Sequence, residues 1–581
     1  MPEPDFSDAR VPIHLRQYVV EQDYDRYDEV DQAVWRFILL HTYGQLRDHA
    51  HPAYADGFGQ AGMRVDRIPR VSEMDRALSR FGWGAVCVDG FIPPRAFQEL
   101  QAQRILPIAA EIRRSNHLAY TPAPDIVHEA AGHAPIVADP QYAGYLQRIG
   151  EVGSRAFSLP QDVAVQEAVR ALSVAKERVA PGSDALSRAE ATLAEAIAGA
   201  GEVSEAAQVA RLHWWTVEYG LVGAMDAPRL YGAGLLSSLG EGHACLRGGA
   251  EHRPLSLACV ETAFDITRPQ PQLFVVPSLG ELVAHVNALA ERLAQRIGGR
   301  VALSRALQSE QLATLRLDGG LDVMGTVVEL PQQDAPPAWV RLAGRRAIAD
   351  AREVLVGPIA PEDRPGVDVL PVLPLGPLAD GRPVSALTHA EIARAFSPSG
   401  AGLRYASGVQ LSGRLQRQLA VNGRPRTVEL VGARVERDGR VLLSAAHGAG
   451  APAAHALPLG GALRQVVAGA TLGAFHPEQP RSGLRAPAIR PAGPHAALDA
   501  LYSRGHRHAR EREALLALRR GVAAYPSDWL LRWNLLESLL SLGVEGREVD
   551  ALANELRALE VSYAHREPIA MGLRSLGLDA A

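Results

Sequence analysis

Two histidines and a glutamate lie within six residues of the chain, in the segment His128-Glu129-Ala130-Ala131-Gly132-His133. A metalloprotease helix carries its two histidine ligands four positions apart, on one face of a regular helix. Here the histidines are five positions apart, so on an ideal α-helix they would point about 140° away from each other. Both can bind one metal ion only if the backbone departs from a regular helix, and Gly132 followed by Pro135 allows that departure. The spacing therefore weighs against a metalloprotease.

A third metal ligand is available in Glu218, which lies between aromatic and β-branched neighbours. A carboxylate in such surroundings is expensive to bury unpaired, and metal ligation would remove that cost. Two neutral histidines and one carboxylate leave coordination positions open, as in the non-haem Fe(II) oxygenases. Each histidine could instead be an ordinary core residue, and Glu218 could form a buried salt bridge with Arg211 or Arg229.

The region around these residues resembles the catalytic domain of the pterin-dependent aromatic amino acid hydroxylases. The motifs that carry the resemblance occur in the family's order, at residues 89–97, 112–133, 214–221, 230–241 and 269–276. The resemblance spans roughly residues 12–305, about half of the chain. It implies that His128, His133 and Glu218 bind iron.

For the amino acid substrate, the resemblance implies a pocket built from five residues. Arg113 would hold the carboxylate, because a planar guanidinium suits bidentate binding of that group. Thr121 and Ser237 would help to position the substrate through their hydroxyls, although both could equally be cap or turn residues. Trp214 and Tyr219 would form the aromatic wall of the pocket.

For the cofactor, the resemblance implies contacts from Glu129, Ile92 and Phe97 with the pterin. His213 stands where the family usually has a pterin-contacting tyrosine, so the stacking arrangement on that side is expected to differ. Asp125 resembles a residue that orients a ligand histidine, a usual companion of metal sites.

The resemblance implies Fe(II) and a tetrahydropterin as cofactors, with O2 and a free aromatic amino acid as substrates. An aromatic ring resists acid–base attack, so a reduced metal and an electron-donating cofactor are needed for its hydroxylation. By analogy with bacterial members of the family we expect L-phenylalanine to be converted to L-tyrosine, with tryptophan or tyrosine hydroxylation as the alternatives. Two hypotheses from other classes are a zinc hydrolase that uses His128, Glu129 and His133, and a scaffold protein.

Composition fits a soluble cytoplasmic enzyme. The chain has 581 residues, 47% of them hydrophobic, and a formal net charge of −5, which gives no sign of a nucleic acid or an anionic membrane as partner. No apolar run has the length of a signal peptide or a membrane span. The cysteines, Cys87, Cys245 and Cys259, form neither a metal-binding nor a disulfide pattern, as expected in a reducing compartment.

Hydrophobic periodicity predicts a multidomain chain. A mainly α catalytic domain of the hydroxylase type is expected at residues 1–310, with an amphipathic helix at Tyr27–His49 and an inserted helical hairpin at about 155–208. This part begins so close to Met1 that we expect no N-terminal regulatory domain. The turn of the hairpin is expected at Ala180-Pro181-Gly182-Ser183-Asp184, where it leads into the N-cap of the second helix.

A β-rich accessory domain is predicted at 311–480, with short strands at 409–411, 418–421, 427–430 and 441–443. Asn422-Gly423 and Asp438-Gly439 are typical hairpin turns. A linker is expected at 481–494 and a helical domain at 495–581, which resembles a tetratricopeptide-like pair or forms a plain helical bundle. The C-terminal domains could bind a protein partner or a second copy of the chain.

Overall fold

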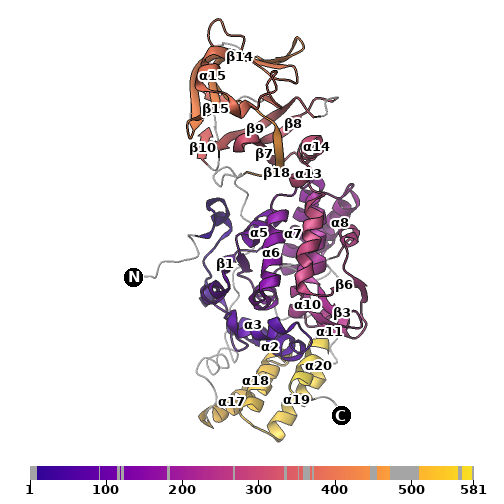
Figure 1. The fold of residues 1–581 in the computed structure, drawn as a ribbon. Coiled ribbons are helices and arrows are strands. Elements are labelled where there is room, and N and C mark those ends of the chain that lie inside the picture. Colours follow the sequence, from indigo (N-terminus) through magenta and orange to yellow (C-terminus); the bar gives the residue numbers. More distant parts are fainter. Residues whose placement is uncertain are drawn as a thin grey trace.

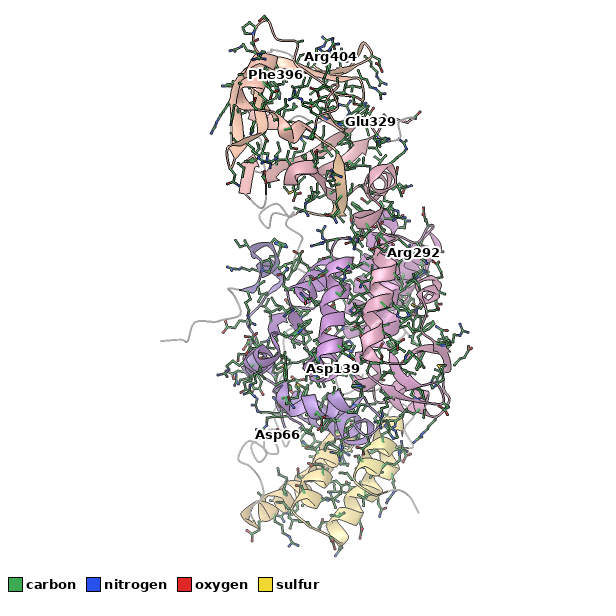
Figure 2. All side chains as sticks on the ribbon, viewed as in Figure 1. Asp66, Asp139, Arg292, Glu329, Phe396 and Arg404 are labelled. Atoms are coloured by element: carbon green, nitrogen blue, oxygen red, sulfur yellow. The ribbon has the colours of Figure 1, made fainter. Side chains whose placement is uncertain are left out.

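The structure is a computed structural model, and it describes most of the chain. The residues outside the description are 1–9, 91, 114–117, 119–123, 179–182, 266–268, 333–335, 351–352, 357–366, 370–371, 445–453, 471–508, 561–565 and 579–581. Figure 1 shows a helical region in the middle, a β-rich region at one end and the C-terminal helices at the other. In Figure 2, Phe396 marks the outer end of the β-rich region, and Arg292 lies where the helical region approaches it. The expected order of helical, β-rich and helical regions is therefore observed, whereas the linker at 481–494 lies outside the described residues.

Helices dominate the chain before residue 310. The α-helices are α2 (Glu29–Leu46), α3 (Pro52–Gln60), α4 (Val71–Leu78), α5 (Pro94–Ala102), α6 (Pro140–Gly153), α7 (Pro160–Arg178), α8 (Asp184–Ala198), α9 (Glu205–His213), α10 (Ala233–Ser237), α11 (Glu241–Leu246), α12 (Leu282–Ala290), α13 (Ala294–Ile297) and α14 (Gly299–Ser309). Two π-helices, η4 (Val127–His133) and η6 (Trp214–Glu218), lie among them. Strands β1 (Gly84–Val88) and β2 (Ile105–Ala109) pair in parallel. A four-stranded sheet has the order β4-β3-β6-β5, from β3 (Leu221–Ala224), β4 (Ala227–Leu230), β5 (Glu251–Pro254) and β6 (Gln272–Val276).

Helix α2 lies between the C-terminal helices and the segments α10 and η4, and it supports the candidate site. Its first turn is held by a capping box, in which the Asp28 carboxylate accepts from the N–H groups of Val30 and Asp31, and the Asp31 carboxylate accepts from the N–H of Asp28. Most of its residues are buried, and it packs against α10 and η4. The helix predicted at Tyr27–His49 is confirmed, with both ends shorter than predicted.

The inserted helical hairpin is formed by α7 and α8, which pack against each other. Their contact is a small apolar cluster that includes Ala168, Leu172 and Leu193. The Ser183 hydroxyl caps α8 by accepting from the N–H of Leu186, which explains where this helix begins. The predicted helices and the predicted N-cap at the end of the turn are confirmed. Residues 180–182 of that turn lie outside the described residues.

The β-rich region contains two six-stranded sheets. The first has the order β10-β9-β8-β7-β18 with β12 beside β9, and comprises β7 (Leu312–Leu317), β8 (Leu321–Glu329), β9 (Trp339–Asp350), β10 (Glu353–Val356), β12 (Val372–Pro374) and β18 (Leu463–Ala468). The second has the order β11-β17-β15-β14-β13 with β16 beside β15, and comprises β11 (Val367–Val369), β13 (Leu403–Arg404), β14 (Val409–Val421), β15 (Arg424–Arg437), β16 (Arg440–Ser444) and β17 (Ala454–Pro458). Helix α15 (His389–Ala395) lies beside them. Helix α14 and the first sheet share one apolar core, so the helical and β-rich regions are joined by packing.

Both hairpin turns of the second sheet form where the sequence predicted them. Asn422 and Gly423 have φ values of 51° and 72°, and Asp438 and Gly439 have 51° and 78°, as type I′ turns require. The prediction of separate strands at 409–411 and 418–421 was wrong, because both segments belong to the single strand β14. Register shifts interrupt the pairing of β14 with β15 in the intervening polar segment, and they hide its strand periodicity.

The described C-terminal region is a set of helices that pack on one another, α17 (Ala509–Gly521), α18 (Trp529–Ser541), α19 (Arg547–Glu560) and α20 (Arg566–Ser575). The Asp528 carboxylate caps α18 by accepting from the N–H of Leu531. The Phe37 ring of α2 packs edge-on against Trp529 and Trp533, with centroids 5.2 and 4.7 Å apart. The C-terminal helices are therefore docked on the helical region (Figure 1).

Among the described residues, no helix combines the length and the apolar character that are needed to cross a bilayer.

Candidate metal centre

The π-helix η4 brings the two histidines of the motif together. A π-helix has hydrogen bonds from residue i to i+5, so side chains five positions apart lie close together. The Nε2 atoms of His128 and His133 are 3.3 Å apart. A Cβ atom at Gly132 would lie 2.8 Å from the carbonyl oxygen of Ala233, so glycine allows η4 to approach α10. The sequence indicated a departure from regular helix here but not which kind.

Glu218 completes the centre from the end of the second π-helix, η6. Its Oε2 atom lies 3.0 Å from His128 Nε2, and its Oε1 atom lies 3.4 Å from His133 Nε2. Ligand atoms of the three side chains all lie within 4.8 Å of one another. Neither arginine considered as an ion-pair partner takes this role in the structure. Arg211 donates to the carbonyl of Val260, and Arg229 donates to main-chain carbonyls near the end of α2.

The charges of this cluster suit a divalent cation. Burial by itself would raise the pKa of Glu218, but the imidazoles of His133 and His128 hold that pKa well below its usual range. Burial lowers the pKa of His128, yet the neighbouring Glu218 carboxylate outweighs it and raises the pKa to about 9. Without a metal, a proton on the imidazole balances the carboxylate, and a bound cation would displace that proton. The donor set therefore fits Fe(II) with two imidazoles and one carboxylate.

Ser237 orients the imidazole of His128. The Ser237 hydroxyl donates to the carbonyl of Ala233 at 2.8 Å, so at 3.0 Å it can accept a hydrogen bond from the His128 Nδ1–H. With the proton on Nδ1, the lone pair of His128 lies on Nε2, the atom that faces the other two ligands and is free to bind a metal. The family resemblance assigned this hydroxyl to the substrate, and its contact with a ligand 109 positions away was not predicted. No local pattern signals such a contact.

Arg113 and Asp125 form a buried ion pair beneath the motif. Nε and Nη2 of Arg113 donate to the two carboxylate oxygens of Asp125 at 2.7 and 2.8 Å. Burial would raise the pKa of Asp125, but the guanidinium holds it below its usual range. The Asp125 carboxylate also accepts from the backbone N–H of His128 at 3.0 Å. Asp125 therefore fixes the first turn of η4, whereas the imidazole ring contacts Ser237.

Aromatic rings form a stack beside the centre. The Trp214 ring stacks on Tyr219 and on Phe264, with centroid distances of 4.8 and 4.4 Å. The Tyr219 hydroxyl donates to the Glu241 carboxylate at 2.9 Å. Phe264 and Glu241 were not predicted as site residues, although Glu241 ends the motif at 230–241. Thr121 lies outside the described residues.

Three of the four predicted cofactor residues lie together. His213 Nδ1 is 3.6 Å from Glu218 Oε1, and the Phe97 ring meets the His213 ring edge-on with centroids 6.0 Å apart. Burial lowers the pKa of His213 to about 4, so this imidazole is neutral at pH 7. The Glu129 carboxylate lies 3.8 Å from His133 Nε2. Ile92 instead packs against the apolar cluster formed by β1 and α5.

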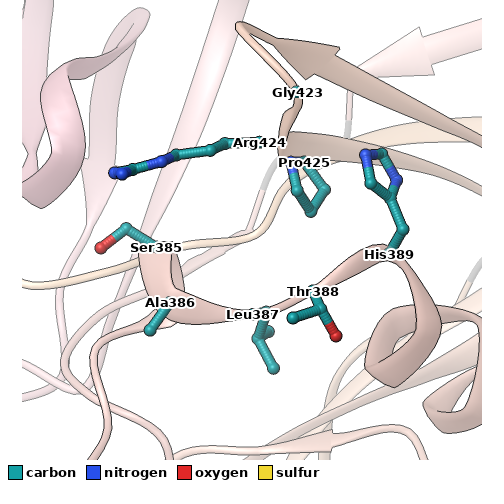
Figure 3. A pocket seen from close by; sticks show the side chains of 8 residues that line it. All are labelled: Ser385, Ala386, Leu387, Thr388, His389, Gly423, Arg424 and Pro425. Carbon is teal, nitrogen blue, oxygen red and sulfur yellow. The ribbon is translucent and has the colours of Figure 1, made fainter.

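A separate cavity of about 470 Å³ lies in the β-rich region, lined by residues 385–389 and 423–425. Figure 3 shows the Arg424 side chain extending along one side of it, opposite Ser385. The lining side chains include hydroxyls, His389 and Arg424, but no carboxylate. This cavity contains none of the predicted site residues.

Comparison with known proteins identifies the family. A family model described as biopterin-dependent aromatic amino acid hydroxylase matches residues 18–158 and 189–302. The phenylalanine-4-hydroxylase of Mesorhizobium japonicum is 30% identical over 269 residues, which are 46% of this chain and 81% of that protein. The Pseudomonas aeruginosa enzyme of the same name is 30% identical over 272 residues, 46% of this chain and 87% of that protein. The chain belongs to the biopterin-dependent aromatic amino acid hydroxylase family.

Solved structures of phenylalanine hydroxylase from Chromobacterium violaceum are also similar to this chain. The form bound to cobalt is 24% identical, covers 51% of this chain and 94% of its own length, and has a TM-score of 0.37. The form with bound iron(III) and the oxidized cofactor 7,8-dihydrobiopterin is 24% identical, covers 50% of this chain and 93% of its own, and has a TM-score of 0.38. Family membership rests on the sequence matches.

The match confirms the enzyme class predicted from the sequence, a pterin-dependent aromatic amino acid monooxygenase. The predicted cofactors, Fe(II) and a tetrahydropterin, agree with the family and with the three-ligand centre. The family model leaves residues 159–188 unmatched. These residues include all of α7, so this helix of the inserted hairpin is an addition to the pattern of the family.

Proposed function

We propose that the protein hydroxylates L-phenylalanine to L-tyrosine with O2, using Fe(II) held by His128, His133 and Glu218 and a tetrahydropterin as the reductant. The observation that carries this proposal is the convergence of the three ligand side chains in a chain of this family. The relatives named above are phenylalanine-4-hydroxylases, which supports phenylalanine as the substrate. Bound Fe(II) and the reduced pterin together supply the electrons that activate O2 for attack on the ring.

In this reaction the protein holds the metal ligands in place and keeps bulk water away from them. Two imidazoles and one carboxylate would hold the metal and would leave coordination positions for O2. His133 and Glu218 are only 2% and 8% exposed, so bulk water is largely kept from the ligand atoms. Ser237 and Asp125 hold His128 through its ring and its backbone, so little rearrangement is needed when the metal binds.

The substrate would lie between Arg113 and the aromatic stack. Asp125 accepts from Nε and Nη2 of Arg113, and Nη1 donates to the Ser237 carbonyl at 3.4 Å. We assign the second N–H of Nη1 to the substrate carboxylate. The ring would contact Trp214. The Tyr219 hydroxyl already donates to Glu241, so the wall offers the substrate a mainly apolar face. Such a wall favours phenylalanine over an amino acid whose ring carries a hydroxyl.

The pterin would be held by Phe97, Glu129 and His213, with Ile92 as an aliphatic contact. Phe97 and the neutral His213 ring offer flat surfaces, and Glu129 offers a carboxylate to the ring N–H groups of the cofactor. Burial raises the pKa of Glu129, although the two ligand histidines oppose that rise. Thr121, which the structure does not describe, remains a predicted substrate contact.

The division of the remaining chain stays a proposal. We assign catalysis to residues 1–310, an accessory role to the β-rich domain at 311–480 and a docking role to the helices at 495–581, in a cytoplasmic protein. Contact with a protein partner or with a second copy of the chain is assigned to the two C-terminal domains.

The test is turnover of the purified full chain. The protein is incubated in air with Fe(II), tetrahydrobiopterin and each of phenylalanine, tyrosine and tryptophan, and products are separated by chromatography. We expect tyrosine from phenylalanine, formed together with oxidised pterin. Conversion of tryptophan without formation of tyrosine would contradict the proposed substrate but not the class. Bound zinc with peptidase activity, and no hydroxylation, would contradict the class.

A further inference from the structure

The β-rich region contacts the helical region through the last residues of β18. Ala468 uses both of its backbone polar groups across this boundary. Its N–H donates to the carbonyl of Arg155, just after α6, at 3.1 Å. Its carbonyl accepts from Nη2 of Arg95, on α5, at 2.9 Å. We refer to Ala468 and Gly469 together as the β18 end.

Gly469 allows this contact to be close. Its φ is +78°, and a Cβ atom built there would lie 1.4 Å from Nη2 of Arg95. An alanine at this position would therefore meet both backbone strain and the guanidinium. Two hydrogen bonds to β7 hold the backbone of the β18 end in place. The Gly469 N–H donates to the carbonyl of Leu312, and the Gly469 carbonyl accepts from the Thr314 hydroxyl.

The Arg95 side chain is partly buried. Its Nε atom is buried with no hydrogen-bond partner among the described residues. Burial lowers the pKa of its guanidinium, while the charges of Glu99 and Tyr18 oppose that change. Glu99 also contacts His14 at 2.8 Å. A partly buried cation whose Nε lacks an acceptor depends on each acceptor that it does reach, and the Ala468 carbonyl is one of them.

Helix α5 links Arg95 to the metal centre. Phe97 follows two positions later on the same helix of nine residues. Its ring contacts His213 edge-on, and His213 Nδ1 lies 3.6 Å from the ligand Glu218. A shift of α5 would therefore move the Phe97 ring relative to His213 and to the side of the site assigned to the pterin.

We propose that the β18 end is a positioning element for the cofactor side of the site: by holding Arg95, it fixes α5 and places Phe97 against His213. This gives the β-rich region a role in the hydroxylation. The cofactor part of the inference rests on the proposed function, whereas the fixing of α5 does not. The competing explanation is that α6 alone holds α5, since Gly150 and Gly153 of α6 already pack closely against Gln98 and its neighbours.

The test compares Gly469→Ala with a matched control, Gly439→Ala, in the full chain. Gly439 also has φ +78°, but nothing lies within 4 Å of the added Cβ atom, so the control carries the same backbone strain without the contact. Two quantities are measured: binding of 7,8-dihydrobiopterin by calorimetry on the iron-loaded protein, and hydrogen exchange of the α5 amides. We expect Gly469→Ala to weaken pterin binding roughly tenfold, because small displacements in a site carry large penalties, and to speed exchange in α5.

A second variant guards against a failure of Gly469→Ala to fold. Arg95→Gln keeps Gly469 and most of the side-chain volume but removes the charge and most of the donors, and it should give the same two changes. Iron content and the Michaelis constant for the amino acid should stay as in the wild type for both variants.

The inference would be overturned if Gly469→Ala and Arg95→Gln both had the pterin affinity and the α5 exchange rates of Gly439→Ala. That result would favour α6 as the sole support of α5. If the wild-type chain binds no pterin, the proposed function fails. Hydrogen exchange of the α5 amides then decides whether the β18 end holds this helix. Equal exchange rates in all variants would contradict the fixing of α5 as well.

Discussion

Carboxylates in the helical and β-rich regions are held in different ways. In the helical region, Glu218 is 8% exposed and lies between two histidines supplied by another π-helix. In the β-rich region, Glu391 lies near the surface and accepts from the Thr388 N–H and from Arg382, both less than ten positions away. The first arrangement depends on tertiary contacts and is suited to binding a cation. The second is satisfied locally and stabilises the start of a helix.

The largest expected effect comes from the buried carboxylate. Glu218→Ala removes one of three ligands and leaves two imidazoles without their charge partner, so iron retention and coupled turnover should be lost. Iron content after gel filtration and tyrosine formation check this result. The control is Glu261→Ala, an exposed carboxylate outside the centre, which should retain both. Iron content and rate unchanged in Glu218→Ala would remove this residue from the ligand set.

The next largest effect is expected from the Ser237 hydroxyl, which orients His128 from a distant segment of the chain. Ser237→Ala removes the acceptor of the His128 Nδ1–H, and iron affinity should fall by about 10–100-fold, as for other residues that orient metal ligands. Competition with an iron chelator measures the affinity. Ser238→Ala is the matched neighbour, because its hydroxyl accepts from the N–H of Glu241 and not from a ligand. Equal affinities in the two variants would contradict the role of Ser237.

One carboxyl group of each region, Glu111 and Glu391, should also respond to pH with opposite sign. Burial, and then the neighbouring Asp89, raises the pKa of Glu111 to about 7. Folding therefore takes up a proton at this group, and its contribution to stability is lost as pH rises from its unfolded value toward 7. The N–H of Thr388, and then Arg382, lower the pKa of Glu391 to about 2, so that contribution is lost as pH falls through the acid range.

Urea unfolding of Glu111→Gln and Glu391→Gln measures these slopes. Relative to Glu111→Gln, the wild type should lose stability between about pH 5 and 8. Relative to Glu391→Gln, it should lose stability below about pH 4. Parallel curves for wild type and Glu111→Gln would show that this carboxyl titrates as it does in the unfolded chain.

The smallest effect belongs to the local turns of the β-rich region. Gly423 has φ +72° and open space around it, so Gly423→Ala should cost about 1–2 kcal/mol of stability from backbone strain alone. Turnover should be unchanged, because the turn lies outside the candidate centre. Thermal unfolding and the hydroxylation assay check both statements. A loss of turnover in folded protein would show that this hairpin affects the site directly.

The contrast between local and tertiary contacts also explains which parts of the fold could be predicted from the sequence. Asn422-Gly423 and Asp438-Gly439 were correctly predicted as turns, because positive φ is a local requirement that few residues meet. Helix α2 was found from its periodicity, although its docking on the C-terminal helices was not. The strand β14 was divided wrongly because its bulged middle lacks alternation.

The site was only partly predictable for a related reason. The ligand set followed from residue types, spacing and a family resemblance that extends over several motifs. The π-helical form of η4 and η6 did not, because the choice between hydrogen-bonding patterns is made by the packing of each segment, such as Gly132 against α10. Contacts between distant segments, such as Ser237 with His128 and Trp214 with Phe264, leave no local signal.

The central claim is that two π-helices bring His128, His133 and Glu218 to one ferrous ion. X-ray absorption spectroscopy of the anaerobic Fe(II)-loaded full chain, together with iron quantification, tests it most directly. We predict one iron per chain with two imidazoles in its ligand shell, and loss of one imidazole signal in His133→Ala. One tightly bound iron with an unchanged spectrum in that variant would contradict the claim.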